Sequence, residues 1–141
     1  MNNLLYLANN DSSDTRIYKE LRTLHKQYNI IYLGINSAGR KEEFFFGKKY
    51  CTHFFIIDGD YKNPITLIKF MLKAYIVVSR FKIKSVHVVN EQILFLVYPL
   101  SFVMNVVLDQ FDSIFHKKLQ FIKKVPFIYS MYYKPLKKII V

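Results

Sequence analysis

The feature that most constrains this sequence is the alternation of short apolar runs with segments of helical periodicity, at intervals of about 20–30 residues. The apolar runs are continuous and do not alternate with polar residues, which is typical of strands buried on both faces of a parallel sheet. We expect strands at 4–7, 30–35, 54–57, 86–89 and 105–108.

Helical segments fall between the expected strands. Ile17, Leu21 and Leu24 recur at helical spacing, and acceptor side chains just before them can cap a first turn. Asn63 and Pro64 are a cap residue and a first helical residue in the order that opens a helix. The helices are expected from residue 15 onward, over 64–81 and over 91–102. This alternation predicts an α/β fold, with a mostly parallel sheet and helices on both faces.

Length and composition narrow the class of protein. The 141 residues fit one domain spanning 1–141, and 52% hydrophobic content with 17% aromatic residues excludes a disordered chain. Cys51, the single cysteine, excludes a disulfide framework and is interpreted as a small strand residue in the reducing cytoplasm. The segment 93–108 carries no charge, but it is broken by Pro99 and is shorter than the roughly 20 residues of a spanning helix. We expect a cytoplasmic protein with no secretory signal and no membrane span.

The net charge of +11 is concentrated in the second part of the chain. Residues 1–60 carry eight basic and seven acidic groups, whereas residues 61–141 carry thirteen basic and three acidic groups. A basic region of this kind suits an anionic membrane surface or a nucleic acid, and a merely solvated surface is the third interpretation.

Ligands of parallel sheets bind at the carboxyl ends of the strands. The loops expected there are 8–14, 36–43, 58–63, 90–92 and 109–113. The first loop has neither the GxGxxG pattern nor a Walker sequence, so a dinucleotide or P-loop site is not expected. Its polar residues and Arg16 could hold an anion at a helix N-terminus, and a capped helix with solvated charges is the alternative. The acidic pairs of the chain are interpreted as loop caps, so we expect no metal and no cofactor.

Three segments carry motif-like patterns. The first reads N-D-x-x-x-D-x-R followed by [IV]-x-K-E-x-x-x-L, with Asn10, Asp11, Asp14, Arg16, Ile17, Lys19, Glu20 and Leu24 at its fixed positions. The second, 86–90, is similar to V-I-H-x-H-[DN], and the third, 106–112, is similar to V-V-Y-D-x-H-[DE]. In this order the segments resemble the glycosyltransferase family 4-like N-terminal domain over roughly residues 3–115.

The resemblance implies a Rossmann-like domain, the N-terminal half of a GT-B fold. Such a retaining glycosyltransferase moves a sugar from a nucleotide-sugar donor to a polysaccharide or lipid-linked acceptor. Its second domain supplies most donor contacts; we expect this chain to lack that domain and to be inactive alone. The substrate-binding residues that the resemblance implies are Asn10, Asp11, Asp14, Arg16, His87, Asn90, Asp109 and Asp112.

Lipid-linked acceptors favour an anionic membrane over nucleic acid as the partner of the basic region. We therefore expect a peripheral location on the inner face of the cell membrane. The side chains expected to face the membrane are Lys69, Lys73, Arg80, Lys117, Lys118, Lys123 and Lys124.

The sequence departs from the family pattern at two histidines. Phe111 and Val89 stand where the family has imidazoles, so no catalytic residue is assigned. His87 matches its motif but lies in an apolar strand, where a buried core histidine is the alternative. The alternative function is a non-catalytic doubly wound module that docks to an anionic membrane or to a partner subunit.

Overall fold

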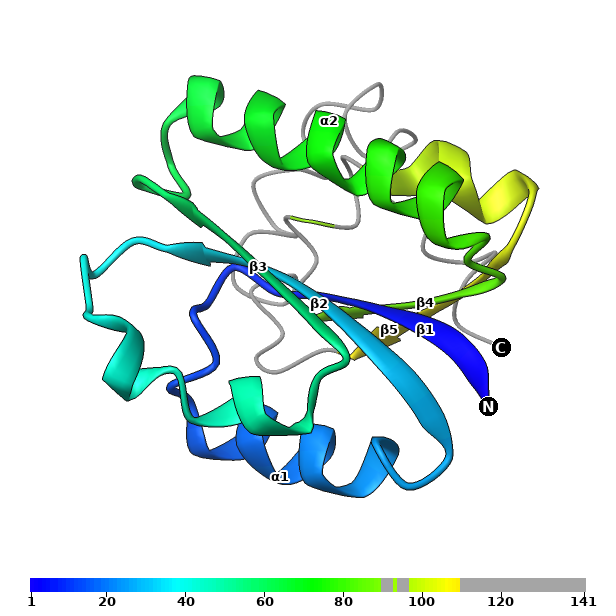
Figure 1. Cartoon of the computed structure of the whole chain (residues 1–141). Helices are drawn as coiled ribbons and strands as arrows, with labels where there is room; N and C mark the ends of the chain where they lie inside the picture. The colour runs from blue at the N-terminus through cyan, green and yellow to red at the C-terminus, as the bar shows by residue number, and fades with distance from the viewer. Residues whose placement is uncertain (90–92, 94–96, 110–141) are drawn as a thin grey trace, which may run out of the picture.

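The computed structural model describes residues 1–89, 93 and 97–109, and the account below concerns these residues. A five-stranded, all-parallel sheet forms the centre of the molecule, in the order β3-β2-β1-β4-β5 (Figure 1). Its strands are β1 (Asn2–Leu7), β2 (Tyr28–Asn36), β3 (His53–Asp58), β4 (Ser85–Val89) and β5 (Asn105–Asp109). The strand order reverses between β1 and β4, which is where ligands of open parallel sheets bind.

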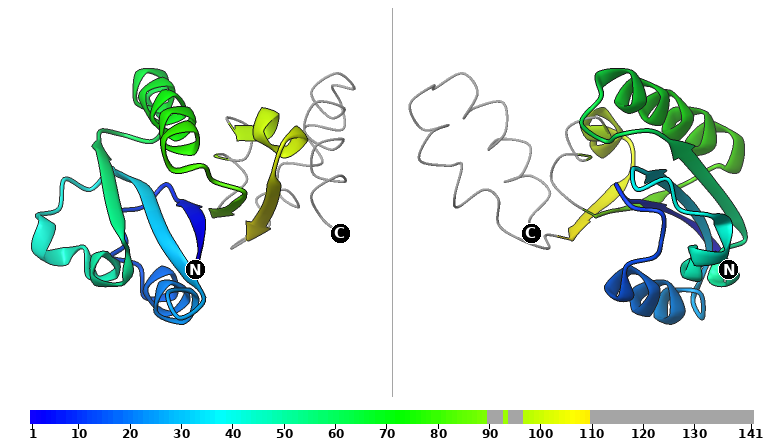
Figure 2. Two further views of the ribbon diagram at one scale, coloured as in Figure 1. Left: turned by 45° about the vertical axis from the view of Figure 1, so that its right-hand side comes forward. Right: turned by 90° about the vertical axis from the view of Figure 1, so that its left-hand side faces the viewer.

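Two α-helices cover opposite faces of the sheet (Figures 1 and 2). Helix α1 (Thr15–Leu24) begins at Asp14, whose carboxylate accepts hydrogen bonds from the backbone N–H groups of Arg16 and Ile17. Helix α2 (Pro64–Phe81) begins at Asn63, whose side chain accepts from the N–H of Ile65 at 2.9 Å. These caps satisfy donors that the first turn of a helix leaves unpaired.

The two sides of the sheet differ in composition. On the α2 side, aliphatic residues of the strands pack against Phe70, Ala74 and Val77 of the helix, all at most 1% exposed. Full burial of a side chain the size of Phe70 stabilises the fold by about 1.5–3 kcal/mol. On the α1 side, tyrosines of β1 and β2 pack with Ile17 and Leu21. The sheet therefore has an aliphatic face and an aromatic face.

The expected α/β architecture is confirmed, with five parallel strands and helices on both faces. The segment after β2, which lacks helical periodicity, contains two 3₁₀ helices, η1 (Glu42–Phe44) and η2 (Phe46–Tyr50). Within the range 91–102, where a helix is expected, residues Tyr98–Phe102 form a further 3₁₀ helix, η3. Its second residue is a proline, which cannot donate a backbone hydrogen bond.

The interpretation of Cys51 as a strand residue is wrong. Cys51 ends η2, and its N–H donates to the carbonyl of Lys48 at 3.1 Å instead of entering the sheet. Its thiol lies 3.4 Å from the carbonyl oxygen of Gly47. The ladder to β2 starts one residue later, where the N–H of Thr52 donates to the carbonyl of Ile30 at 2.8 Å.

Candidate functional site: a charged cluster beside β1 and β4

A row of stacked rings crosses the aromatic face of the sheet. Strand register places Phe54, Tyr32, Tyr6 and His87 side by side on β3, β2, β1 and β4. Neighbouring ring centroids lie 4.9, 5.6 and 4.7 Å apart along this row, and the rings of each pair are within 18° of parallel. The row ends at His87 on β4, and stacking on Tyr6 fixes the plane of the His87 imidazole.

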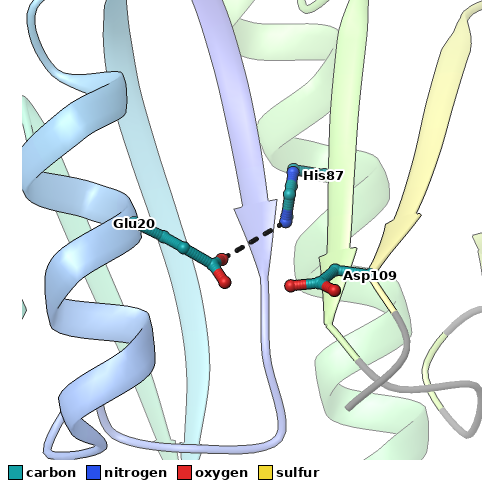
Figure 3. Close-up of side chains that lie close together, drawn as sticks. All are labelled: Glu20, His87 and Asp109. Carbon is teal, nitrogen blue, oxygen red and sulfur yellow. Dashed lines mark ion pairs between the residues drawn. The ribbon is translucent and has the colours of Figure 1, made fainter.

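Ionisable side chains from three elements meet at that end of the row. Glu20 comes from α1, His87 from β4 and Asp109 from the last position of β5 (Figure 3). The Tyr6 hydroxyl donates to Oε2 of Glu20 at 2.5 Å, and Nε of Arg16 donates to Oε1 of the same carboxylate at 3.0 Å. Arg16 and Glu20 lie one helical turn apart, so both project toward the sheet from one side of α1.

Arg16 links the helix to the far strand. Its Nη2 donates to Oδ1 of Asp109 at 2.5 Å, across 93 positions of sequence. One guanidinium thus binds two carboxylates, those of Glu20 and Asp109. Such charge-assisted hydrogen bonds are stronger than those between neutral groups, and they hold the planar guanidinium of Arg16 in place.

The pKa values of the two carboxylates are shifted in opposite directions. Burial by itself raises the pKa of Glu20, but His87, Tyr6, Asp109 and Arg16 around it lower that pKa to about 2. Burial, together with the nearby charge of Glu20, raises the pKa of Asp109 above its usual value, although Arg16 opposes the shift. Burial and the Glu20 carboxylate also raise the pKa of Tyr6, which keeps its hydroxyl protonated as a donor. Glu20 is therefore the anchored anion of the cluster.

The imidazole of His87 points toward the carboxylates. Its Nε2 is buried and lies 3.6 Å from Oε2 of Glu20, beyond hydrogen-bond distance, and no described residue supplies it with a hydrogen-bond partner (Figure 3). Ligand atoms of Glu20, His87 and Asp109 lie within 4.8 Å of one another, a donor set that a divalent cation can use. Arg16 already contacts both carboxylates, so a metal ion would have to displace its guanidinium.

The polar loop after β1 is organised by internal bonds. Asp11, only 2% exposed, accepts from the N–H of Ser13 at 3.0 Å and pairs with Arg40 at 3.4 Å. The carbonyl of Asn10 accepts from the Tyr32 hydroxyl at 2.7 Å. Asp14 occupies the first N–H groups of α1, the groups that an anion would otherwise bind. These expected substrate contacts thus lie close together and shape the loop.

A shallow pocket of about 280 Å³ opens beside the N-terminus of α1. It is lined by Ser13, Thr15, Tyr18, Phe46 and Lys49. The Lys49 ammonium lies 5.3 Å from the centre of the Tyr18 ring and 5.2 Å from that of Tyr50. Three of these residues come from α1 and the loop before it and two from η2, so the pocket depends in part on the segment that sequence periodicity did not assign.

The structure brings together Arg16, His87 and Asp109 from the expected set of site residues. Asn90 and Asp112, and the basic residues Lys117, Lys118, Lys123 and Lys124, lie outside the described residues. Sequence reasoning missed Tyr6 and Glu20 as members of the cluster. The available signal was a tyrosine in the otherwise aliphatic run of β1, and a glutamate one turn after Arg16.

Comparison with protein-family models and with curated proteins finds no match to this chain.

Proposed function

We propose that this chain is the acceptor-side domain of a retaining glycosyltransferase of GT-B type. In this proposal the sugar passes from a nucleotide-sugar donor to a polysaccharide or lipid-linked acceptor, and a second domain provides most donor contacts. The parallel sheet and its polar carboxyl edge suit such a domain.

The observation that carries the proposal is the convergence of the three motif-like segments. Arg16 and Glu20 belong to the first, His87 to the second and Asp109 to the third, and the four side chains form one cluster. These segments were grouped by sequence pattern alone, so their meeting at the β1–β4 boundary is an independent observation in favour of a shared site.

The chemistry of the cluster suits an acceptor better than a donor. Two carboxylates surround one guanidinium, so the positive charge of Arg16 is already matched and is a weak attraction for a diphosphate. The two carboxylates and the imidazole instead offer hydrogen-bond partners for sugar hydroxyl groups. We assign Arg16 the role of positioning Glu20 and Asp109, and Asp109 that of contacting the acceptor.

Binding measurements test this assignment. The full 141-residue chain, labelled for NMR, would be titrated with alkyl glycosides and separately with nucleotide-diphosphate sugars. We expect glycosides to shift the His87 ring signals, and Asp109→Asn to weaken glycoside binding by about tenfold. Glu43→Gln, an exposed acidic residue of η1, is the matched control and should leave binding unchanged. The proposal fails if no glycoside perturbs the cluster.

A transfer assay separates this function from its alternative. With a radiolabelled nucleotide sugar, we expect transfer only when a donor-binding domain is supplied with the chain. Transfer by residues 1–141 alone would contradict the assignment of the donor contacts to a second domain. Glycoside binding without transfer in any combination would favour the alternative, a non-catalytic module that docks to a membrane or to a partner subunit.

A further inference from the structure

Helix α2 has a second apolar face that the sheet does not cover. Its outward side chains follow the helical spacing 3, 4 and 4, which places them on one side of the helix. They are between 52% and 62% exposed, and we call them the apolar stripe: Ile65, Ile68, Leu72 and Ile76. The opposite side of α2 is the one that packs on the sheet. Helix α2 is therefore apolar on two sides, and one side is exposed.

Basic side chains run along one flank of the apolar stripe. Lys69 is exposed, the ammonium of Lys73 lies 4.5 Å from the centre of the Phe55 ring, and the Arg80 guanidinium lies 5.6 Å from that of Phe81. From residue 61 to residue 89 the chain has six basic residues and no aspartate or glutamate. The partner of this face must accept aliphatic groups and carry negative charge.

An anionic lipid surface has both properties. Aliphatic side chains insert between acyl chains, while lysine and arginine reach the lipid phosphates from the edge of the helix. Nucleic acid fits less well, because single strands stack on aromatic rings and the apolar stripe contains none. A second copy fits less well too, because pairing two such helices brings basic flanks together without acidic partners on α2.

We propose that α2 docks in the plane of an anionic membrane, with the apolar stripe inserted and the basic flank on the lipid headgroups. No described helix combines the length and hydropathy needed to cross a bilayer. Helix α2, 18 residues and about 27 Å long, would lie along the interface. Arg16 and Glu20 of the charged cluster belong to α1, which covers the opposite face of the sheet from α2 (Figures 1 and 2), so the cluster stays clear of the lipid. This inference does not depend on sugar transfer.

Vesicle co-sedimentation of the full chain tests the docking. Vesicles of phosphatidylcholine alone would be compared with vesicles of equal parts phosphatidylcholine and phosphatidylglycerol. We expect binding to the anionic vesicles only, weakened by added salt. Ile68→Ser with Leu72→Ser should reduce that binding at least about tenfold, and Lys69→Gln with Lys73→Gln should remove most of the preference for anionic lipid.

Two control variants make similar changes elsewhere on the protein: one removes two exposed positive charges, and the other removes one exposed apolar side chain. Lys19→Gln with Lys26→Gln removes two exposed charges from the α1 side, and Phe44→Ser removes an apolar side chain of η1 that is 45% exposed. Both should bind as the unmodified chain does, and urea unfolding would show that every variant is folded.

Three results would overturn the proposal. In the first, the unmodified chain binds neither kind of vesicle, or binds both equally. In the second, the Ile68→Ser/Leu72→Ser variant binds as the unmodified chain does, which would place the contact elsewhere. A dimer in sedimentation velocity that this double substitution abolishes would identify a second copy as the occupant instead.

Discussion

Nη2 of Arg16 lies 2.5 Å from Oδ1 of Asp109, and this contact ties the first turns of α1 to the carboxyl end of β5. Asp109 is the last described residue of an edge strand, and β5 pairs only with β4 among the described strands. The ion pair therefore adds a side-chain connection between that edge and the helix on the aromatic face.

Replacing Arg16 should weaken this connection. Arg16→Gln leaves the carboxylates of Glu20 and Asp109 close together without their shared cation, and we expect a loss of about 1–2 kcal/mol in the free energy of unfolding. The value is modest because the Arg16 side chain is 41% exposed and water screens the charges. Urea unfolding measures it, with Arg22→Gln on the exposed side of α1 as the control. Equal losses in the two variants would show that only helix propensity is involved.

Glu20 should make the stability of the fold depend on acid pH. Its pKa is about 2 in the folded protein and about 4.5 in the unfolded chain, so its contribution is complete above pH 4.5. That contribution is lost as pH falls toward 2. We expect Glu20→Gln to cost about 1–3 kcal/mol at pH 7 and progressively less below pH 4. Unfolding curves across this range measure it, and a gap between the two proteins that does not narrow in acid would contradict the assignment.

Gly34 should tolerate no side chain. A Cβ atom there would lie 2.2 Å from the carbonyl oxygen of Asn10 and 2.6 Å from Cε1 of Tyr32. Because the first obstacle is backbone, Gly34→Ala is expected to cost about 2–3 kcal/mol. Gly39→Ala is the comparison, since its Cβ meets nothing within 4 Å and only its φ of +62° opposes it, at about 1 kcal/mol. Thermal unfolding that ranks Gly39→Ala as the more harmful substitution would reject the steric explanation.

The thiol of Cys51 should react slowly in the folded protein. Burial raises its pKa to about 12, so the thiolate fraction at neutral pH is about a thousandfold below that of an ordinary cysteine. We expect slow labelling by a disulfide reagent in buffer and fast labelling in urea. Because the chain has one cysteine, the rate reports this site alone. Fast labelling without denaturant would place the thiol at the surface.

The sequence pattern was sufficient for the strands and the two α-helices, because each is encoded locally. Helix α2 begins at Pro64 and ends at Phe81, as predicted from its cap and its apolar repeat. The charged cluster is different. Arg16 and Asp109 meet only because β1, β4 and β5 pair in a particular order, and Tyr6 faces His87 only because of their register. Local sequence periodicity predicts neither of these contacts, although the motif resemblance did single out Arg16, His87 and Asp109.

The segment between β2 and β3 also escaped prediction, for a local reason. Three consecutive phenylalanines, 44–46, interrupt any simple period, and the two 3₁₀ helices there are too short to impose one. Gly47 allows the close approach of η2 to the loop after β1, because a Cβ there would lie 2.9 Å from the Cβ of Ser12. Its N–H donates to the Ser12 hydroxyl at 3.2 Å.

The stacked row of rings across the sheet gives the protein an intrinsic spectroscopic signal. The chain has no tryptophan, so tyrosine dominates its near-ultraviolet absorption. Tyr6 and Tyr32 are fully buried, 5.6 Å apart and nearly parallel, an arrangement that couples their electronic transitions. Their circular dichroism band should persist only while β1 and β2 keep their register, so a spectrometer can follow the assembly of the aromatic face without any added dye.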